Sequence, residues 1–123
     1  MILIGKIKSG LGEACFWMKK AEEAFYKKTG TKMFHGTLNV KLEKDYILQD
    51  NLKVLHKEEY GGTQEVYMKE CEILGHKSYI VRTDKNMSEN RDHPLNIIEV
   101  ISDMNFREKY NLKDEDEIEI KIR

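Results

Sequence analysis

The sequence has few of the features that mark membrane, secreted or zinc-binding proteins. No apolar run approaches the length needed to cross a bilayer, and the apolar start at residues 1–4 is too short for a signal-peptide core. The two cysteines, Cys15 and Cys71, form no CxxC pair, and the four histidines are scattered, so neither a disulfide framework nor a zinc site is indicated. Six methionines and two free thiols suit a reducing compartment. We therefore expect a cytoplasmic protein with no membrane partner.

An excess of charge of either sign is also missing. Lys and Arg together number 21 and Asp and Glu together 22, which gives a net charge of −1. With no basic stripe and no helix-turn-helix pattern, a DNA-binding protein is disfavoured, and we expect no nucleic-acid partner. A small anion bound by local groups remains compatible with this balance. At 123 residues, 40% of them hydrophobic, the chain fits one domain, residues 1–123, with one core.

Proline is nearly absent. The single one, Pro94, follows the polar stretch 84–93, which we interpret as a long surface loop, either functional or mobile. Hydrophobic periodicity and capping residues predict helices at 17–28 and 103–110. Alternating or β-branched segments predict strands at 2–7, 37–43, 52–56, 65–74, 78–82, 96–101 and 117–122. Many short strands with two helices indicate a mainly β fold, a small β-barrel with the helices outside it or across one end.

A pair of glycines, Gly10 and Gly12, lies between the first predicted strand and the first helix. Glycines permit a sharp turn whose exposed amide groups can bind phosphate oxygens, assisted by the positive end of the following helix. Cys15 replaces the third glycine of a dinucleotide-binding fingerprint, and no P-loop sequence is present. Taken alone, this segment is therefore interpreted more simply as a strand-to-helix turn.

Two further segments carry oxygen ligands on predicted strands. If Leu38 faces the core, Thr37 and Asn39 project from the opposite face, where a hydroxyl and a carboxamide oxygen suit Mg²⁺. The alternative is an ordinary solvated strand face. Glu99 interrupts the apolar run 97–101, and a buried strand does not accept an unpaired carboxylate. Glu99 is therefore expected to face either solvent at the barrel rim or a ligand pocket.

The last candidate segment is the predicted helix that begins at Asp103. Arg107 near its start could bind a nucleotide, since a guanidinium and a helix N-terminus both attract phosphate. The simpler interpretation is an ion pair with Asp103, four residues earlier. A cysteine nucleophile is not indicated, because no base accompanies Cys15 or Cys71 in the sequence.

In their order and spacing, these segments resemble the CTP-dependent riboflavin kinases over nearly the whole chain. The matching motifs are Gly-Leu-Gly-Glu, Gly-Thr-Leu-Asn, Ile-Glu-Val-Ile and an Arg-Glu helix that leads to Asn-Leu-Lys-Asp. The resemblance implies a small closed six-stranded cradle-loop barrel. It also implies an enzyme that transfers a phosphate from CTP to riboflavin, giving CDP and FMN, with Mg²⁺ as cofactor. We expect a monomer that acts on these small molecules.

The resemblance further implies roles for individual residues. The nucleotide-binding residues would be Gly10, Leu11, Gly12, Glu13, Ala14, Cys15, Phe16, Met104, Asn105, Phe106 and Arg107. Thr37 and Asn39 would be the metal ligands. Glu99 would bind the flavin and act as the catalytic carboxylate that orients the ribityl hydroxyl. Arg91 stands where the family can place a flavin-contacting Thr, and Thr83 is an alternative to it.

Departures from the family pattern leave a second function open. Ala14 and Cys15 replace a common Gly-Arg pair, which removes a basic contact to phosphate, and Arg91 replaces the Thr. Glu115 and Glu117 alter a commoner Asp-Gly-Asp turn, a change expected to affect only the last hairpin. The alternative to a kinase is a barrel that binds flavin or nucleotide without catalysis, as a sensor would.

Overall fold

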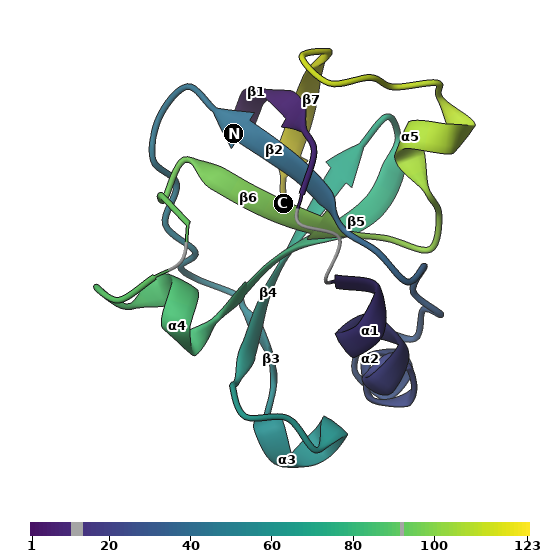
Figure 1. Ribbon diagram of the computed structural model, residues 1–123, viewed down its shortest axis with the longest axis vertical. Coiled ribbons are helices and arrows are strands. Elements are labelled where there is room, and N and C mark those ends of the chain that lie inside the picture. Colours follow the sequence, from purple (N-terminus) through teal and green to yellow (C-terminus); the bar gives the residue numbers. More distant parts are fainter. Residues whose placement is uncertain (11–13, 92) are drawn as a thin grey trace.

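The computed structural model describes residues 1–10, 14–91 and 93–123 (Figure 1). The strands are β1 (Ile2–Lys8), β2 (Leu38–Leu42), β3 (Lys53–Leu55), β4 (Val66–Ile73), β5 (His76–Thr83), β6 (Ile97–Ile101) and β7 (Glu117–Ile122). The helices are α1 (Ala14–Lys20), α2 (Glu22–Thr29), α3 (Lys57–Tyr60), α4 (Asp84–Met87) and α5 (Phe106–Lys109). Every strand expected from the sequence overlaps one of these.

The strands form an antiparallel sheet that closes on itself. Their order is β3-β4-β5-β6-β2-β1-β7, and β4 also pairs with β7. Six strands therefore make a closed barrel, and β3 is an additional strand on the edge of β4. This confirms the mainly β barrel expected from the strand pattern and the six closing strands that the family resemblance implies. Closure leaves few free strand edges, which is the usual way in which a small β protein avoids pairing with other chains.

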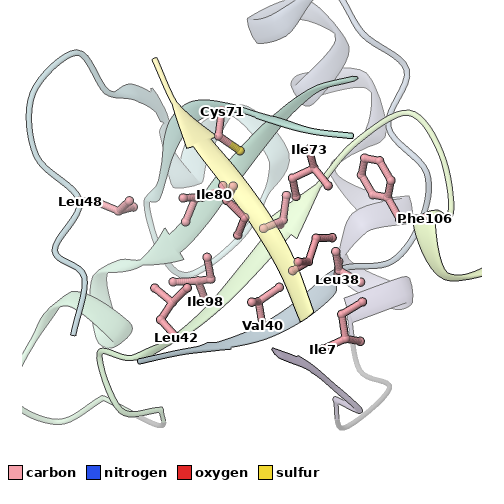
Figure 2. Close-up of a cluster of buried hydrophobic side chains, with 13 residues drawn as sticks. Ile7, Leu38, Val40, Leu42, Leu48, Cys71, Ile73, Ile80, Ile98 and Phe106 are labelled. Atoms are coloured by element: carbon pink, nitrogen blue, oxygen red, sulfur yellow. The ribbon is translucent and has the colours of Figure 1, made fainter. Parts of the chain in front are cut away.

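Two clusters of buried side chains replace the single core expected from chain length. One fills the barrel, as Figure 2 shows, and its members include Ile7, Leu38, Val40, Leu42, Leu48, Cys71, Ile73, Ile80, Ile98 and Phe106. The other lies between the first two helices and the β3–β6 part of the sheet, and it includes Met18, Phe25, Leu55, Met68 and Tyr79. The division arises because α1 and α2 cover an outer face of the sheet (Figure 1), so residues on both faces of β4 and β5 are buried.

The helices differ from the sequence expectation in their bounds. The expected helix at 17–28 is broken at Ala21, although Ala21 N–H still donates to Trp17 and its carbonyl accepts from Phe25, both at 2.9 Å. α5 begins after Asn105, whose side chain accepts a hydrogen bond from Glu108 N–H at 3.2 Å. The expectation that Asp103 caps this helix is therefore wrong, because Asn105 satisfies the helix N-terminus closer to the helix.

The expected loop 84–93 begins with a helical turn, α4. Thr83 caps it by accepting a hydrogen bond from Asn86 N–H at 3.4 Å. Arg82, in β5 directly before Thr83, has a buried guanidinium that donates to the carbonyl oxygens of Tyr46 and, at 2.8 Å, of Leu95. Arg82 thus connects the segment that follows β2 to the segment that precedes β6. Among the described residues, no helix is long and apolar enough to span a membrane.

Candidate functional site

The register of three strands brings distant polar residues into one row. Lys8 on β1 lies opposite Asn39 on β2, and Asn39 lies opposite Glu99 on β6. Directly opposite residues in antiparallel strands carry their side chains on the same face. Leu38 is buried in the barrel, so Thr37 and Asn39 share the other face, as the sequence predicted. The end of β1, the start of β2 and the second half of β6 therefore meet at one place.

Glu99 is the most constrained carboxylate in this row. Its Oε1 accepts a hydrogen bond from the Thr37 hydroxyl at 3.2 Å. Burial raises the pKa of Glu99 above the usual 4.5, because desolvation disfavours the ionised form, while the Thr37 hydrogen bond and the proximity of His93 act in the opposite direction. Of the two environments that the sequence left open, Glu99 occupies a partly buried pocket.

Gly10 completes the row where the chain leaves β1. A Cβ atom added to Gly10 would lie 3.0 Å from Cγ of Asn39 and closer still to its Nδ2. Only glycine therefore lets the backbone pass so close to the Asn39 carboxamide without moving it. Of the other predicted turn residues, Leu11, Gly12 and Glu13 lie outside the described residues. Ala14, Cys15 and Phe16 begin α1, where Ala14 is partly buried and the other two are exposed.

The second predicted nucleotide segment lies against the same site. Thr37 lines a small pocket together with Phe34, Gly36, Leu38, Val100, Ser102, Met104, Asn105, Phe106 and Arg107. The pocket thus joins the proposed metal ligand Thr37 to all four residues of the segment 104–107. Arg107 does not pair with Asp103 as the simpler interpretation expected, because Asp103 lies outside the helix. Instead, Nη1 of Arg107 lies 2.7 Å from Oδ1 of Asp114.

A second pocket adjoins Glu99 on the side of α4. It is lined by Val81, Arg82, Asn86, His93, Pro94, Ile97 and Glu99. The Asn86 side-chain oxygen is buried and has no hydrogen-bond partner among residues 1–10, 14–91 and 93–123, which is uncommon for a polar atom. Sequence reasoning missed Asn86 and His93, although the length and polarity of the loop 84–93 gave a general signal.

Arg91 and its alternative Thr83, predicted to bind flavin beside Glu99, both lie outside the lining of the pocket at Glu99. Arg91 is exposed and donates to the Ser88 carbonyl at 2.9 Å, and it does not line the pocket at Glu99. Thr83, the alternative, directs its hydroxyl to the first turn of α4. The structure therefore brings neither of them into the lining of this pocket, and a flavin contact by Arg91 stays a prediction.

The donor set at the row fits a magnesium ion. The Thr37 hydroxyl, the Asn39 carboxamide and the Glu99 carboxylate are hard oxygen donors gathered on one face. Among the described residues, no group of three or more His, Cys, Asp or Glu side chains could hold a metal ion. Two neutral donors beside one carboxylate suit an ion that takes its remaining ligands from water and phosphate.

The thiol of Cys71 and the ring of Tyr79 are buried in the two hydrophobic clusters, and Trp17 packs against one of them. Burial raises the pKa of Cys71 to about 12, so this thiol stays protonated and is a poor nucleophile. Trp17 packs against Phe25 with ring centroids 5.9 Å apart, and Tyr79 is 1% exposed. Tyr79 is therefore not free to stack on a ligand, whereas Trp17 is partly buried and Phe16 on α1 is 80% exposed.

The turn before β7 reaches this site, contrary to the expectation that its changes affect only the last hairpin. Glu115 adopts a left-handed backbone conformation, with φ of 76°, which explains why glycine is the commoner residue there. Its N–H donates to the Ile7 carbonyl at 2.8 Å, and its carboxylate pairs with Lys8. The turn therefore packs on the end of β1, next to Gly10.

Comparisons with known proteins agree on one family. A family model named for the CTP-dependent riboflavin kinases (CTP-dep_RFKase), described as a domain of unknown function, DUF120, matches residues 7–122. A riboflavin kinase of Pyrobaculum aerophilum is 33% identical over 98% of this chain and 60% of its own length. That of Staphylothermus marinus is 32% identical over 98% and 90%, and that of Methanocella arvoryzae 29% over 98% and 56%. The chain thus spans little more than half the length of some relatives and nearly all of another.

Proposed function

The chain belongs to the family of CTP-dependent riboflavin kinase domains, and from this premise we propose that it transfers the γ-phosphate of CTP to the ribityl 5′-hydroxyl of riboflavin. The products are FMN and CDP. The observation that carries the proposal is the convergence of four residues beside a pocket that Arg107 also lines: Gly10 after β1, Thr37 before β2, Asn39 in β2 and Glu99 in β6. Phosphoryl transfer needs mainly positioning and neutralisation of charge, and this arrangement offers groups for both.

The nucleotide is assigned to the pocket between Thr37 and the segment 104–107. Arg107 supplies a cation at the pocket wall, and guanidinium groups bind phosphate oxygens in pairs. Gly10 starts the glycine turn, whose amide groups would hold the phosphate tail. Since Ala14 and Cys15 offer no cation, Arg107 is the side chain in this pocket best suited to balance the phosphate charge.

Thr37 and Asn39 would hold a magnesium ion on the face that they share with Glu99. Such an ion, when bound, neutralises charge on the phosphate oxygens. The Thr37 hydroxyl can serve two groups at once, because it donates its proton to Glu99 and still offers lone pairs to a cation. Thr37 would in this way fix the position of the Glu99 carboxylate relative to the nucleotide.

Glu99 is assigned the role of binding and orienting the ribityl 5′-hydroxyl of riboflavin. A partly buried carboxylate fixed by one hydrogen bond can accept a second one from the ribityl 5′-hydroxyl and so orient that oxygen toward the γ-phosphate. As the new bond to phosphorus forms, the hydroxyl proton passes to Glu99. The raised pKa makes Glu99 a better proton acceptor than an exposed carboxylate.

Asn86 supports placing the ribityl chain in the pocket beside Glu99. Its buried side-chain oxygen lacks a donor within the described part of the chain, and such an unpaired group costs about 1–3 kcal/mol. A ribityl hydroxyl is a donor of the right kind, and one hydroxyl matches the small cavity, about 10 Å³ in volume, that Arg82, His93 and Glu99 line together with Asn86.

The direct test is to incubate the purified protein with riboflavin, Mg²⁺ and either CTP or ATP, and to separate the flavins by chromatography. The proposal expects FMN with CTP, equimolar CDP, and no FMN once the divalent cation is chelated. If no nucleotide yields FMN, the kinase is excluded. Flavin binding without turnover would then support the alternative, a non-catalytic flavin-binding barrel.

A further inference from the structure

The turn at 113–116 is bonded closely to the end of β1. Ile7 N–H donates to the Asp116 carbonyl at 2.9 Å, and its carbonyl accepts from Glu115 N–H at 2.8 Å. Lys113 N–H donates to the Asp116 carboxylate at 2.8 Å, which closes the turn on itself. The turn is therefore a rigid support for the residues that follow β1, rather than a free hairpin tip.

Asp114 in this turn uses both carboxylate oxygens, each for a different part of the chain. Oδ2 accepts a hydrogen bond from the Ser9 hydroxyl at 2.7 Å. Oδ1 lies 2.7 Å from Nη1 of Arg107 on α5. The Ser9 hydrogen bond and the Arg107 guanidinium both hold the pKa of Asp114 below its usual value. Charged hydrogen bonds of this length are stronger than neutral ones.

The two partners of Asp114 lead to opposite sides of the proposed nucleotide site. Ser9 precedes Gly10, whose backbone lies against the Asn39 carboxamide. Arg107 lines the pocket that contains Thr37, whereas Asp114 does not. Asp114 lies outside the pocket and bonds to both sides of it. It thus connects Gly10, beside the proposed metal ligand Asn39, to Arg107, which lines the pocket with the other proposed ligand, Thr37.

We propose that Asp114 is a positioning residue, which acts through Ser9 and Arg107 to hold Gly10 and the helix α5 in register for the nucleotide phosphates. This inference rests on the proposed function. We call the two bonds from Asp114 to Ser9 and Arg107 the clamp. An exposed ion pair alone contributes little to stability, so the clamp matters mainly because it fixes the positions of these two residues. Loss of the clamp should weaken nucleotide binding and leave both the fold and the flavin side of the site nearly unchanged.

The test compares Asp114→Asn and Asp114→Ala with Glu115→Gln. The Glu115 variant is a matched control, because it neutralises the neighbouring carboxylate of the same turn, which pairs with Lys8 and not with Arg107. Calorimetric titration of CDP should show about tenfold weaker binding for both Asp114 variants. The KM for CTP should rise similarly, while the KM for riboflavin and the thermal midpoint should stay within error. Glu115→Gln should leave the affinity for CDP unchanged.

A coupling measurement separates a clamp from a simple local effect. Ser9→Ala should weaken CDP binding in the unmodified background and have no further effect in the Asp114→Ala background, because Ser9 acts through that carboxylate. Arg107→Met removes the proposed phosphate contact itself and should weaken CDP binding in both backgrounds.

Unchanged CDP affinity in the Asp114 variants of an active enzyme would overturn the clamp and leave the kinase proposal intact. Equal losses in Glu115→Gln would also overturn it, by assigning the effect to the turn as a whole. Failure of the unmodified protein to bind CDP or form FMN would instead refute the proposed function, and the clamp with it.

Discussion

The Thr37 hydroxyl donates a hydrogen bond to Glu99 across 3.2 Å, between residues 62 positions apart in the sequence. The bond crosses from the segment that enters β2 to the middle of β6, and it joins a proposed metal ligand to the proposed catalytic carboxylate. It also opposes the effect of burial on Glu99, since it lowers a pKa that desolvation raises. The two residues should therefore be tested as a pair.

Replacement of Thr37 by Val, which has a similar shape but no hydroxyl, should lower turnover by about 10²-fold, because both a metal ligand and the partner of Glu99 are lost. The fold should lose only about 1 kcal/mol, the usual contribution of one such hydrogen bond. The measurement is FMN formation at several Mg²⁺ concentrations, together with thermal unfolding. Thr37→Ser keeps the hydroxyl and should retain most activity. Equal activity of the Val variant and the unmodified protein would refute the assignment of Thr37.

Glu99→Gln should make the fold more stable at neutral pH while it abolishes most turnover. The pKa of Glu99 in the folded protein lies above the usual 4.5, so folding favours the protonated form. The stability associated with Glu99 is present below pH 4.5 and is lost as the pH rises through the folded pKa. The gain in thermal midpoint should therefore be seen at neutral pH and vanish in acid.

Glu119→Gln, on the exposed side of β7, is the control and should show no such pH-dependent gain. If Glu99→Gln is as stable as the unmodified protein at every pH, burial does not act on this carboxylate in the way described above.

The strands of the barrel were predictable because their signals are local, whereas its closure depends on the distant pairing of β4 with β7. Leu38, Val40 and Leu42 alternate with polar residues and are buried as the pattern indicates, and Ile118 and Ile120 of β7 do the same. The short helices were less predictable, because distant side chains support them. Lys57 N–H at the start of α3, for example, donates to the Glu65 carboxylate at 2.7 Å.

The candidate site was predictable residue by residue but not as a set of contacts. Two-residue spacing on a strand was enough to place Thr37 and Asn39 on one face. The approach of Glu99 depends on the register between β2 and β6, which no local pattern specifies. The partner of Arg107 was missed for a related reason. The helix starts three residues later than expected, so the spacing that favoured Asp103 did not apply.

Gly10→Ala should disturb the site through Asn39. The new methyl group would press on the Asn39 carboxamide, and moving that side chain away from its preferred rotamer costs about 0.5–1.5 kcal/mol. We expect lower thermal stability and a higher Mg²⁺ concentration for half-maximal activity. In the double variant Gly10→Ala with Asn39→Ala, stability should recover because the obstructing side chain is gone, while activity should stay low. Persistent instability of the double variant would show that the backbone at Gly10, rather than Asn39, resists the change.

Asn86→Leu should separate flavin recognition from folding. The variant removes a buried oxygen for which the described residues supply no partner, so the free energy of unfolding should stay the same or increase. Loss of the acceptor should raise the dissociation constant for riboflavin about tenfold, measured by quenching of flavin fluorescence. Lumiflavin, which lacks the ribityl chain, should bind both proteins equally.

The exposed residue Asn90 provides the matched control for Asn86, because Asn90→Leu changes the same kind of side chain in the same loop. This variant should alter neither the affinity for riboflavin nor that for lumiflavin. A weaker affinity for lumiflavin in Asn86→Leu would place Asn86 against the ring system instead of the chain. Unchanged riboflavin binding would mean that the Asn86 oxygen finds its donor elsewhere, and the pocket beside Glu99 would then lose the polar group that best matches a hydroxylated ligand.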